Sequence, residues 1–135
     1  IHFSHPERSL VDTMIYDQDC STQTARNRLG AFNFRGEDVF KPVSALSGGE
    51  QSRLRLCMLM DEQINLLILD EPMNGLDNQG VQDIRELLLK LKEEGKTILL
   101  ASHNREDISV LCDTVVEIDK GKIVTEGSFY NSSDI

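Results

Sequence analysis

The sequence predicts an α/β fold in which parallel strands form a sheet and helices pack against it. Two short apolar runs, Leu66–Leu69 and Thr97–Ala101, have the length and composition of strands that are buried on both faces. Between them, residues 80–94 place apolar side chains at helical spacing, and Gly95 follows as a helix stop. This order of strand, helix and strand favours a right-handed crossover within one parallel sheet.

A helical part, residues 1–62, is expected to precede the sheet. Short helices are predicted at Ser9–Asp17 and Ser21–Leu29, because each segment begins with a serine that can cap it. Gly30 is expected to end the second of them. A third helix is predicted to begin at Ser47 and to end near residue 60.

The remaining residues, 63–135, are expected to contain the sheet. After the second strand, a helix is predicted at Arg105–Cys112 and a third strand at Thr114–Ile118, which would join the same parallel sheet. The turn Asp119–Lys122 then leads into Ile123–Glu126, so the chain is predicted to end in a β-hairpin.

Composition limits the classes of function. The 135 residues carry a net charge of −9 without a dense run of Lys or Arg, which disfavours direct binding of DNA or RNA. Three cysteines without a C-x-x-C spacing indicate neither a disulfide framework nor a zinc site, so reduced thiols in a cytoplasmic protein are expected. No transmembrane segment or signal peptide is recognised, and a chain that begins at Ile1 is expected to be a fragment.

Two carboxylates, Asp70 and Glu71, follow the first predicted strand. A carboxylate at the end of a buried strand is costly to desolvate, so Asp70 is a candidate ligand for Mg²⁺. Glu71 is expected to point elsewhere, where it could polarise a water for attack on a γ-phosphate. An acidic loop that merely ends the strand is the alternative, and the glycine-rich turn upstream favours the functional interpretation.

His103 follows the second predicted strand, at the same edge of the sheet as Glu71. An imidazole at this place can hydrogen-bond a γ-phosphate oxygen and sense its loss after hydrolysis. A surface or capping residue is the alternative. The shared edge favours a functional histidine.

Ser47, Gly48 and Gly49 open the third predicted helix. Two glycines let a backbone approach an anion closely, and a helix N-terminus presents free N–H groups and the positive end of its dipole. The Ser47 hydroxyl could donate to a phosphate oxygen, whereas a plain serine cap is the alternative. Asp77, in the turn Asn74–Asp77, could cap the next helix, make a contact between subunits, or do both.

Together these motifs resemble the ATP-binding cassette (ABC) superfamily over roughly residues 43–124. The similarities are Leu46–Gln51 to its signature motif, Leu66–Glu71 to its Walker B strand with the catalytic glutamate, Asn74–Asp77 to its D-loop, and His103 to its switch histidine. The resemblance implies a partial P-loop NTPase (RecA-like) parallel sheet with flanking helices, residues 63–135, plus an α-helical subdomain, residues 1–62.

The resemblance also implies roles for individual residues. It implies a head-to-tail dimer of cassettes with ATP and Mg²⁺ held between them. Glu71 and His103 would be catalytic and Asp70 would hold the metal, all for the nucleotide of their own cassette. Nucleotide-binding contacts are implied for Ser47, Gly48, Gly49, Glu50 and Asp77.

One part of the family pattern does not occur in these residues. The phosphate loop G-x-x-x-x-G-K-[ST] is absent from the sequence, and no Q-loop is recognised. The expected partner is therefore the missing N-terminal cassette half or a second cassette. Alone, the chain is expected to bind ATP weakly, to hydrolyse little or none of it, and to self-associate through exposed apolar edges.

A finer resemblance divides the chain near the Walker B motif. Residues 1–72 look like the second cassette of an ABC-F protein, a class that acts on ribosomes, whereas residues 73–126 are more similar to cassette subunits of bacterial exporters with a membrane-domain partner. Met73 and Gly75 stand where the ABC-F pattern has Thr and His. A chimera is one hypothesis for this mismatch, and an atypical natural member is the other.

The sequence is compatible with two further alternatives. The C-terminal lobe of a chromosome-maintenance type ATPase head carries similar motifs, but Ser9–Leu29 shows no sustained heptads of the coiled coil that would lead into such a lobe. A catalytically inert module that presents the signature helix to a partner is the other alternative.

Overall fold

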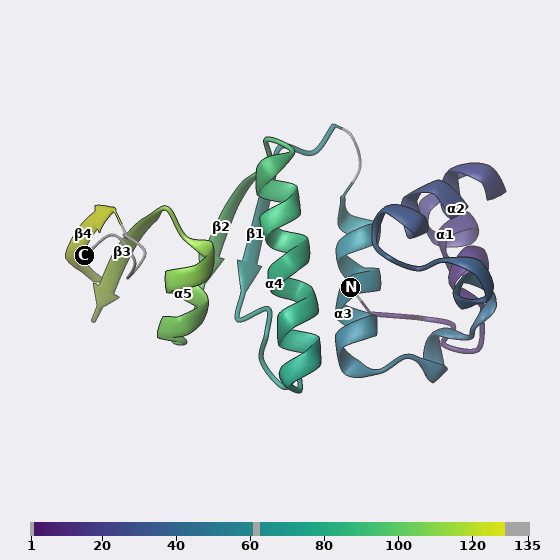
Figure 1. Cartoon of the computed structure of the whole chain (residues 1–135), viewed down its shortest axis with the longest axis horizontal. Coiled ribbons are helices and arrows are strands. Elements are labelled where there is room, and N and C mark those ends of the chain that lie inside the picture. The colour runs from purple at the N-terminus through teal and green to yellow at the C-terminus, as the bar shows by residue number, and fades with distance from the viewer. Residues whose placement is uncertain (1, 61–62, 129–135) are drawn as a thin grey trace.

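The computed structural model describes residues 2–60 and 63–128, which form an elongated row of helices and strands (Figure 1). The helices are α1 (Leu10–Gln18), α2 (Thr22–Ala31), α3 (Gly48–Leu59), α4 (Asn78–Glu93) and α5 (Arg105–Leu111), with 3₁₀ turns η1 (Gly36–Phe40) and η2 (Val43–Ala45). The strands are β1 (Leu66–Asp70), β2 (Thr97–Ala101), β3 (Thr114–Asp119) and β4 (Lys122–Ser128). None of the described helices is long and apolar enough to cross a membrane.

Serine caps begin the first two helices, as the sequence predicts. The Ser9 hydroxyl accepts from the Asp12 amide, and the Ser21 hydroxyl accepts from the Thr24 amide, each at 3.1 Å. These bonds satisfy N–H groups that have no partner within the helix.

The prediction that Gly30 ends α2 is wrong, because Gly30 lies inside the helix. The chain instead turns at Asn33, whose φ of 67° is in the left-handed region. The Phe34 amide then donates back to the Leu29 carbonyl at 2.9 Å. This turn directs Phe34 into the core, where it is 1% exposed.

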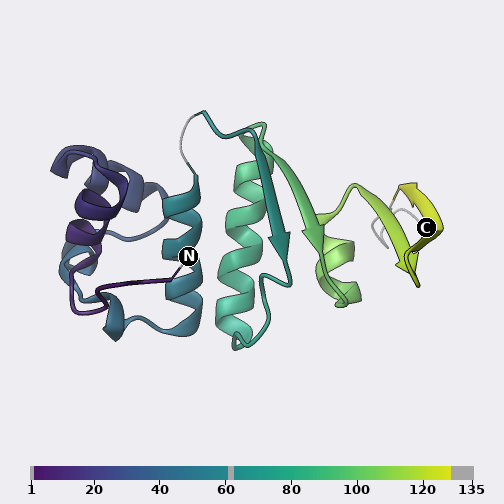
Figure 2. The same ribbon diagram turned by 180° about the vertical axis from the view of Figure 1, so that it is seen from behind.

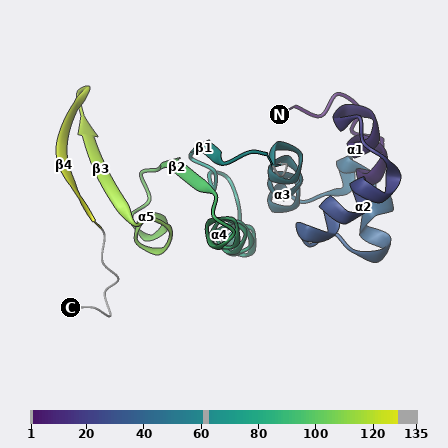
Figure 3. The ribbon, with the colours of Figure 1, turned by 90° about the horizontal axis from the view of Figure 1, so that it is seen from above.

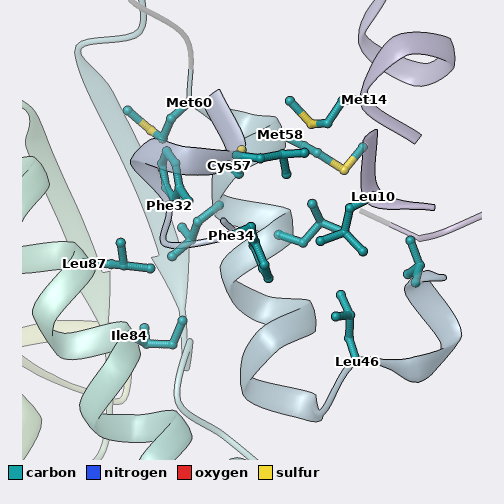
Figure 4. Packing of buried hydrophobic residues seen from close by; sticks show 14 of the residues in the cluster. Leu10, Met14, Phe32, Phe34, Leu46, Cys57, Met58, Met60, Ile84 and Leu87 are labelled. Atoms are coloured by element: carbon teal, nitrogen blue, oxygen red, sulfur yellow. The ribbon is translucent and has the colours of Figure 1, made fainter. Parts of the chain in front are cut away.

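The main core surrounds α3 (Figure 4). Leu10 and Met14 of α1, together with Phe34, gather on one side of this helix, and Ile84 and Leu87 of α4 face it from the other side. Burial of these apolar side chains supplies the main driving force for folding. Because α3 contacts both groups, it joins the helical end of the molecule to the sheet.

α3 and α4 approach each other most closely at two glycines. A Cβ built on Gly49 would lie 2.8 Å from the Gly80 Cα, which is closer than real Cβ atoms come. The two helix N-termini therefore pack backbone against backbone. This contact requires glycine at position 49 for steric reasons alone.

β1 and β2 are parallel, as predicted, and lie side by side in Figure 2. Their register pairs Ile68 with Leu99 and Asp70 with Ala101. α4 provides the crossover between them. The α/β class predicted from the sequence is confirmed.

The prediction that both strands are buried on two faces is wrong. α4 covers one face of the pair, and no described element covers the other (Figure 3). Side chains alternate between the faces of a strand, so Leu67 is buried while its neighbour Ile68 is 66% exposed. Leu99, beside Ile68 in the register, is 60% exposed.

The prediction that the third strand joins the parallel sheet is also wrong. β3 pairs antiparallel with β4 in a separate two-stranded sheet. In Figures 1 and 3, α5 lies between β2 and β3, so β3 is separated from the parallel pair. β4 is then the nearest partner, across a turn in which Lys120 and Gly121 have positive φ. The predicted terminal hairpin is confirmed; residues 129–135 lie outside the described residues.

The glycine contact predicts that Gly49→Ala destabilises the chain. The added methyl must displace the backbone of α4, and we expect a loss of about 1–3 kcal/mol in the free energy of unfolding. Gly48→Ala is the matched control, since its Cβ would meet only the Leu76 side chain at 3.6 Å, an ordinary contact. Urea unfolding followed by circular dichroism compares the two variants, and equal stabilities would contradict the steric role of Gly49.

Candidate functional site

The predicted site residues lie at strand ends and helix starts along one long side of the molecule. In Figure 1 the carboxyl ends of β1 and β2 point the same way as the N-termini of α3 and α4. Loops at the carboxyl ends of parallel strands are the usual location of ligand sites in such sheets. The structure arranges the predicted residues there in two groups.

Glu71 and His103 form the first group. The Glu71 carboxylate Oε1 accepts from the His103 backbone N–H at 2.9 Å and lies 3.7 Å from the imidazole Nε2. Glu71 is about one-third exposed, whereas the His103 side chain is fully exposed. The contact brings together two residues that the sequence analysis placed at the same edge.

Glu71 has an unusual backbone conformation. Its φ of 45° is in the left-handed region, which costs a residue with a Cβ about 1–2 kcal/mol. This geometry lets the Glu71 amide donate to the Ala101 carbonyl at 2.8 Å while its side chain reaches His103. Strained residues of this kind are concentrated at functional sites.

The turn after β2 is ordered by short hydrogen bonds. The Asn104 amide donates to the Ser102 hydroxyl at 3.0 Å. The Asn104 side-chain oxygen then caps α5 by accepting from the amides of Glu106 and Asp107. His103 therefore lies between a paired strand and a capped helix.

Asp70, the predicted metal ligand, ends β1 and is exposed. The argument that it needs a cation because it is buried is therefore wrong for this chain. Among the described residues, no group of three or more His, Cys, Asp or Glu side chains could hold a metal. A single exposed carboxylate does fit Mg²⁺, which typically takes one or two carboxylates and completes its shell with water and phosphate oxygens.

The start of α3 forms the second group. The Ser47 hydroxyl accepts from the Glu50 amide at 3.2 Å, and the Glu50 carboxylate accepts from the Ser47 amide at 3.0 Å. In this reciprocal capping box, both side chains satisfy backbone N–H groups at the helix start, which gives each of them a structural role. Gly48 is exposed, so its backbone is open to a ligand, whereas Gly49 is buried against α4.

Asp77 belongs to this second group. Its carboxylate accepts from the Gly80 amide at 2.8 Å and so caps α4. Because Gly49 touches Gly80, the turn that contains Asp77 lies directly against the start of α3. The capping interpretation of Asp77 is confirmed, and the intersubunit contact stays a prediction.

Sequence reasoning missed an ion pair between α4 and α5. Arg85 Nε lies 2.8 Å from Asp107 Oδ1, and the Asp107 side chain is 4% exposed. A buried Asp within the first turn of a helix looks in the sequence like an ordinary exposed N-terminal acid. Only the packing of α5 on α4 distinguishes it.

Two of the cysteines, Cys57 and Cys112, do not have the character of a catalytic thiol. Burial raises the pKa of the Cys57 thiol to about 12, and burial also raises the pKa of Cys112. A nucleophilic thiolate requires the opposite shift.

Comparison with known proteins gives the family. The family model described as ABC transporter matches residues 2–74. The lantibiotic transport ATP-binding protein SrtF of Streptococcus pyogenes is 32% identical over 132 residues, covering 98% of this chain and 56% of SrtF. The uncharacterized ABC transporter ATP-binding protein YybJ of Bacillus subtilis is 37% identical over 99 residues, covering 73% of this chain and 44% of YybJ.

A solved structure agrees with these matches. CbiO1 of Clostridium perfringens, part of the ABC transporter complex cbiONQ, superposes with a TM-score of 0.77 at 27% identity, covering 93% of this chain and 53% of CbiO1. The chain thus spans about half the length of the proteins it matches. Since the family match covers more than half of its residues, the chain belongs to the ABC transporter family.

Proposed function

We propose that this chain supplies the water-activating and signature parts of an ATP-hydrolysing cassette, and that a phosphate-binding part comes from elsewhere. The observation that carries the proposal is the contact of Glu71 with His103 at the carboxyl ends of β1 and β2. It places a carboxylate that can accept a proton from water 3.7 Å from an imidazole that can donate to a phosphate oxygen.

Glu71 and His103 of the first group, and Asp70 at the end of β1, each have one task in this proposal. Glu71 orients the attacking water and takes its proton, while the exposed His103 imidazole contacts the γ-phosphate and responds to its departure. Asp70 holds Mg²⁺, directly or through water, and the metal supplies charge neutralisation at the phosphates. The strained backbone of Glu71 keeps its carboxylate at the strand end.

The second group serves a different nucleotide in this proposal, one held by a partner cassette. The α3 N-terminus offers free amides and a positive dipole end to phosphate oxygens, and exposed Gly48 lets the backbone come close. Ser47 can donate its hydroxyl proton to the nucleotide while its oxygen keeps the cap. Glu50 acts by maintaining the capping box. Asp77 would make its contact across the same dimer interface.

The uncovered face of the sheet supports a missing partner segment. Ile68 and Leu99 form an exposed apolar pair on this face. A separate shallow depression, lined mainly by apolar side chains, lies where α3, α4 and β1 meet, with Leu56 and Leu69 among its lining residues. Contiguous exposed apolar surface of this kind marks an interaction site. Because the relatives are about twice as long as this chain, we propose that the occupant is the remaining cassette half.

The parent is best described as a transporter ATP-binding subunit. SrtF is named for lantibiotic transport and CbiO1 for a transporter complex, and the alignment with SrtF covers nearly the whole chain. A ribosomal ABC-F role for residues 1–72 and a chimera joined near residue 72 gain no support from these matches. They stay hypotheses that sequencing the source gene would decide.

Glu71→Gln tests the proposal directly. The chain is mixed with a separately expressed N-terminal cassette half that carries a phosphate loop, and phosphate release from ATP is measured. We expect turnover only in the mixture, and we expect Glu71→Gln to lower it by about a hundredfold or more, since the base is lost.

Glu86→Gln, at an exposed position of α4, is the matched control and should keep full turnover. Absence of turnover in the wild-type mixture would contradict the proposed function and favour an inert interaction module.

Two substitutions at Ser47 separate capping from phosphate contact. Asn and Asp cap helices about as well as Ser, so Ser47→Asn and Ser47→Asp should each leave the free energy of unfolding within about 0.5 kcal/mol of wild type. Only Ser47→Asp places a negative charge towards the nucleotide. We expect it to abolish turnover in the mixture, whereas Ser47→Asn retains much more. Equal turnover of the two variants would contradict a phosphate at this helix N-terminus.

The exposed sheet face predicts self-association of the isolated chain. Replacing Ile68 and Leu99 together by Thr keeps strand propensity while removing apolar surface, so we expect a shift towards monomer in sedimentation velocity. Tyr16→Gln removes an exposed aromatic ring at the far end of the molecule, on α1, and should change nothing. An unchanged sedimentation profile of the double variant would show that association uses another surface.

A further inference from the structure

We propose that Arg85 of α4 is a positioning residue, which holds His103 beside Glu71 by anchoring Asp107 of α5. The placement of His103 is a property of this chain's structure. Its importance for ATP hydrolysis rests on the proposed function.

The anchor is a buried ion pair. Arg85 Nε and Nη2 lie 2.8 and 2.5 Å from Asp107 Oδ1, and the two side chains are only 15% and 4% exposed. Arg85 also faces Glu106, but at 3.7 Å and with the Glu106 side chain 74% exposed. A charge pair taken out of water holds its geometry strongly, because either charge alone would be costly to bury.

The ion pair acts on His103 through a short chain of hydrogen bonds. Asp107 donates its backbone N–H to the Asn104 side chain at 3.1 Å, so the anchored residue also belongs to the α5 cap. Asn104 is the neighbour of His103, and its own amide donates to Ser102 at 3.0 Å. Residues 102–104 are thus the entire link between β2 and α5.

Both ends of that link are fixed. At the strand end, Ala101 pairs with Asp70 and accepts from the Glu71 amide. At the helix end, Arg85 holds Asp107. With three residues between two fixed points, the His103 amide is directed at the Glu71 carboxylate, where it donates at 2.9 Å.

A second ion pair joins α4 to the segment that follows α5, and it gives a comparison for simple attachment. Lys92 and Asp113 connect α4 to the residues after α5, but their side chains are 40% and 75% exposed. Exposed pairs contribute little to stability. The buried pair lies instead at the end of α5 that leads directly to His103, which is where control of orientation is needed.

The test compares Asp107→Asn with Glu106→Gln. Each removes one carboxylate charge that faces Arg85, the first buried and the second exposed. The readout is the NMR signal of the His103 amide proton in the 135-residue chain, with Glu71→Ala defining its position when the acceptor is gone. We expect Asp107→Asn to move this signal most of the way to the Glu71→Ala position. Glu106→Gln should leave it unmoved.

Two variants of Arg85 test the same ion pair from its other partner, so the experiment can still be read if Asp107→Asn does not fold. Arg85→Gln should move the His103 signal as Asp107→Asn does, and Arg85→Lys, which keeps the charge, should restore at least part of the wild-type position. Amide signals of β1 and β2 report whether each variant is folded. A folded Arg85→Gln or Asp107→Asn variant with the wild-type His103 signal would overturn the proposal.

Turnover in the complemented mixture separates this inference from the proposed function. If wild type hydrolyses ATP, we expect Asp107→Asn to lower kcat about tenfold or more with little change in KM, because orientation rather than binding is lost. Unchanged kcat would overturn a catalytic consequence of the anchor. If wild type itself fails to hydrolyse ATP, the proposed function falls, while a moved His103 signal still supports the positioning role.

Discussion

The pairing of β1 with β2 is the constraint on which the candidate site depends. In this register Asp70 lies beside Ala101, so the two strands end together and the next residues of each chain segment meet. Glu71 continues the pairing by one hydrogen bond to Ala101 and then leaves the strand direction with a positive φ. A slip of one residue would reverse which side chains face α4 and would separate Glu71 from His103.

The glycine contact between α3 and α4 determines how the second group of residues is arranged. Because the two helices touch through Gly49 and Gly80, the capped start of α3 lies directly against the capped start of α4. Packing against Gly80 thus already requires a glycine at position 49. The sequence alone suggests a different reason for this glycine, namely close approach to a phosphate. Gly48, which is exposed, is the glycine left to approach a ligand.

The features that could be predicted from the sequence are those that depend on residues close together in the chain. Ser9, Ser21 and Ser47 each form the cap that their position in the sequence indicates, because a cap needs only residues a few positions apart. The partner of β3 and the exposure of Ile68 depend on which segments are present to pair and to cover. These non-local facts, like the burial of Asp107 by α4, leave no periodic or capping pattern in the sequence.

The contacts that surround Glu71 and His103 come from nearby elements of this chain. Their contact is maintained by the β1–β2 pairing on one side and by the packing of α5 on α4 on the other, all within residues 66–111. The backbone of His103 is thus already directed at Glu71, so the proposed phosphate-binding partner would have less of this loop to order on association. Ile68 and Leu99 expose apolar surface on the same two strands that place Glu71 and His103, so the proposed partner surface and the proposed site share one structural element.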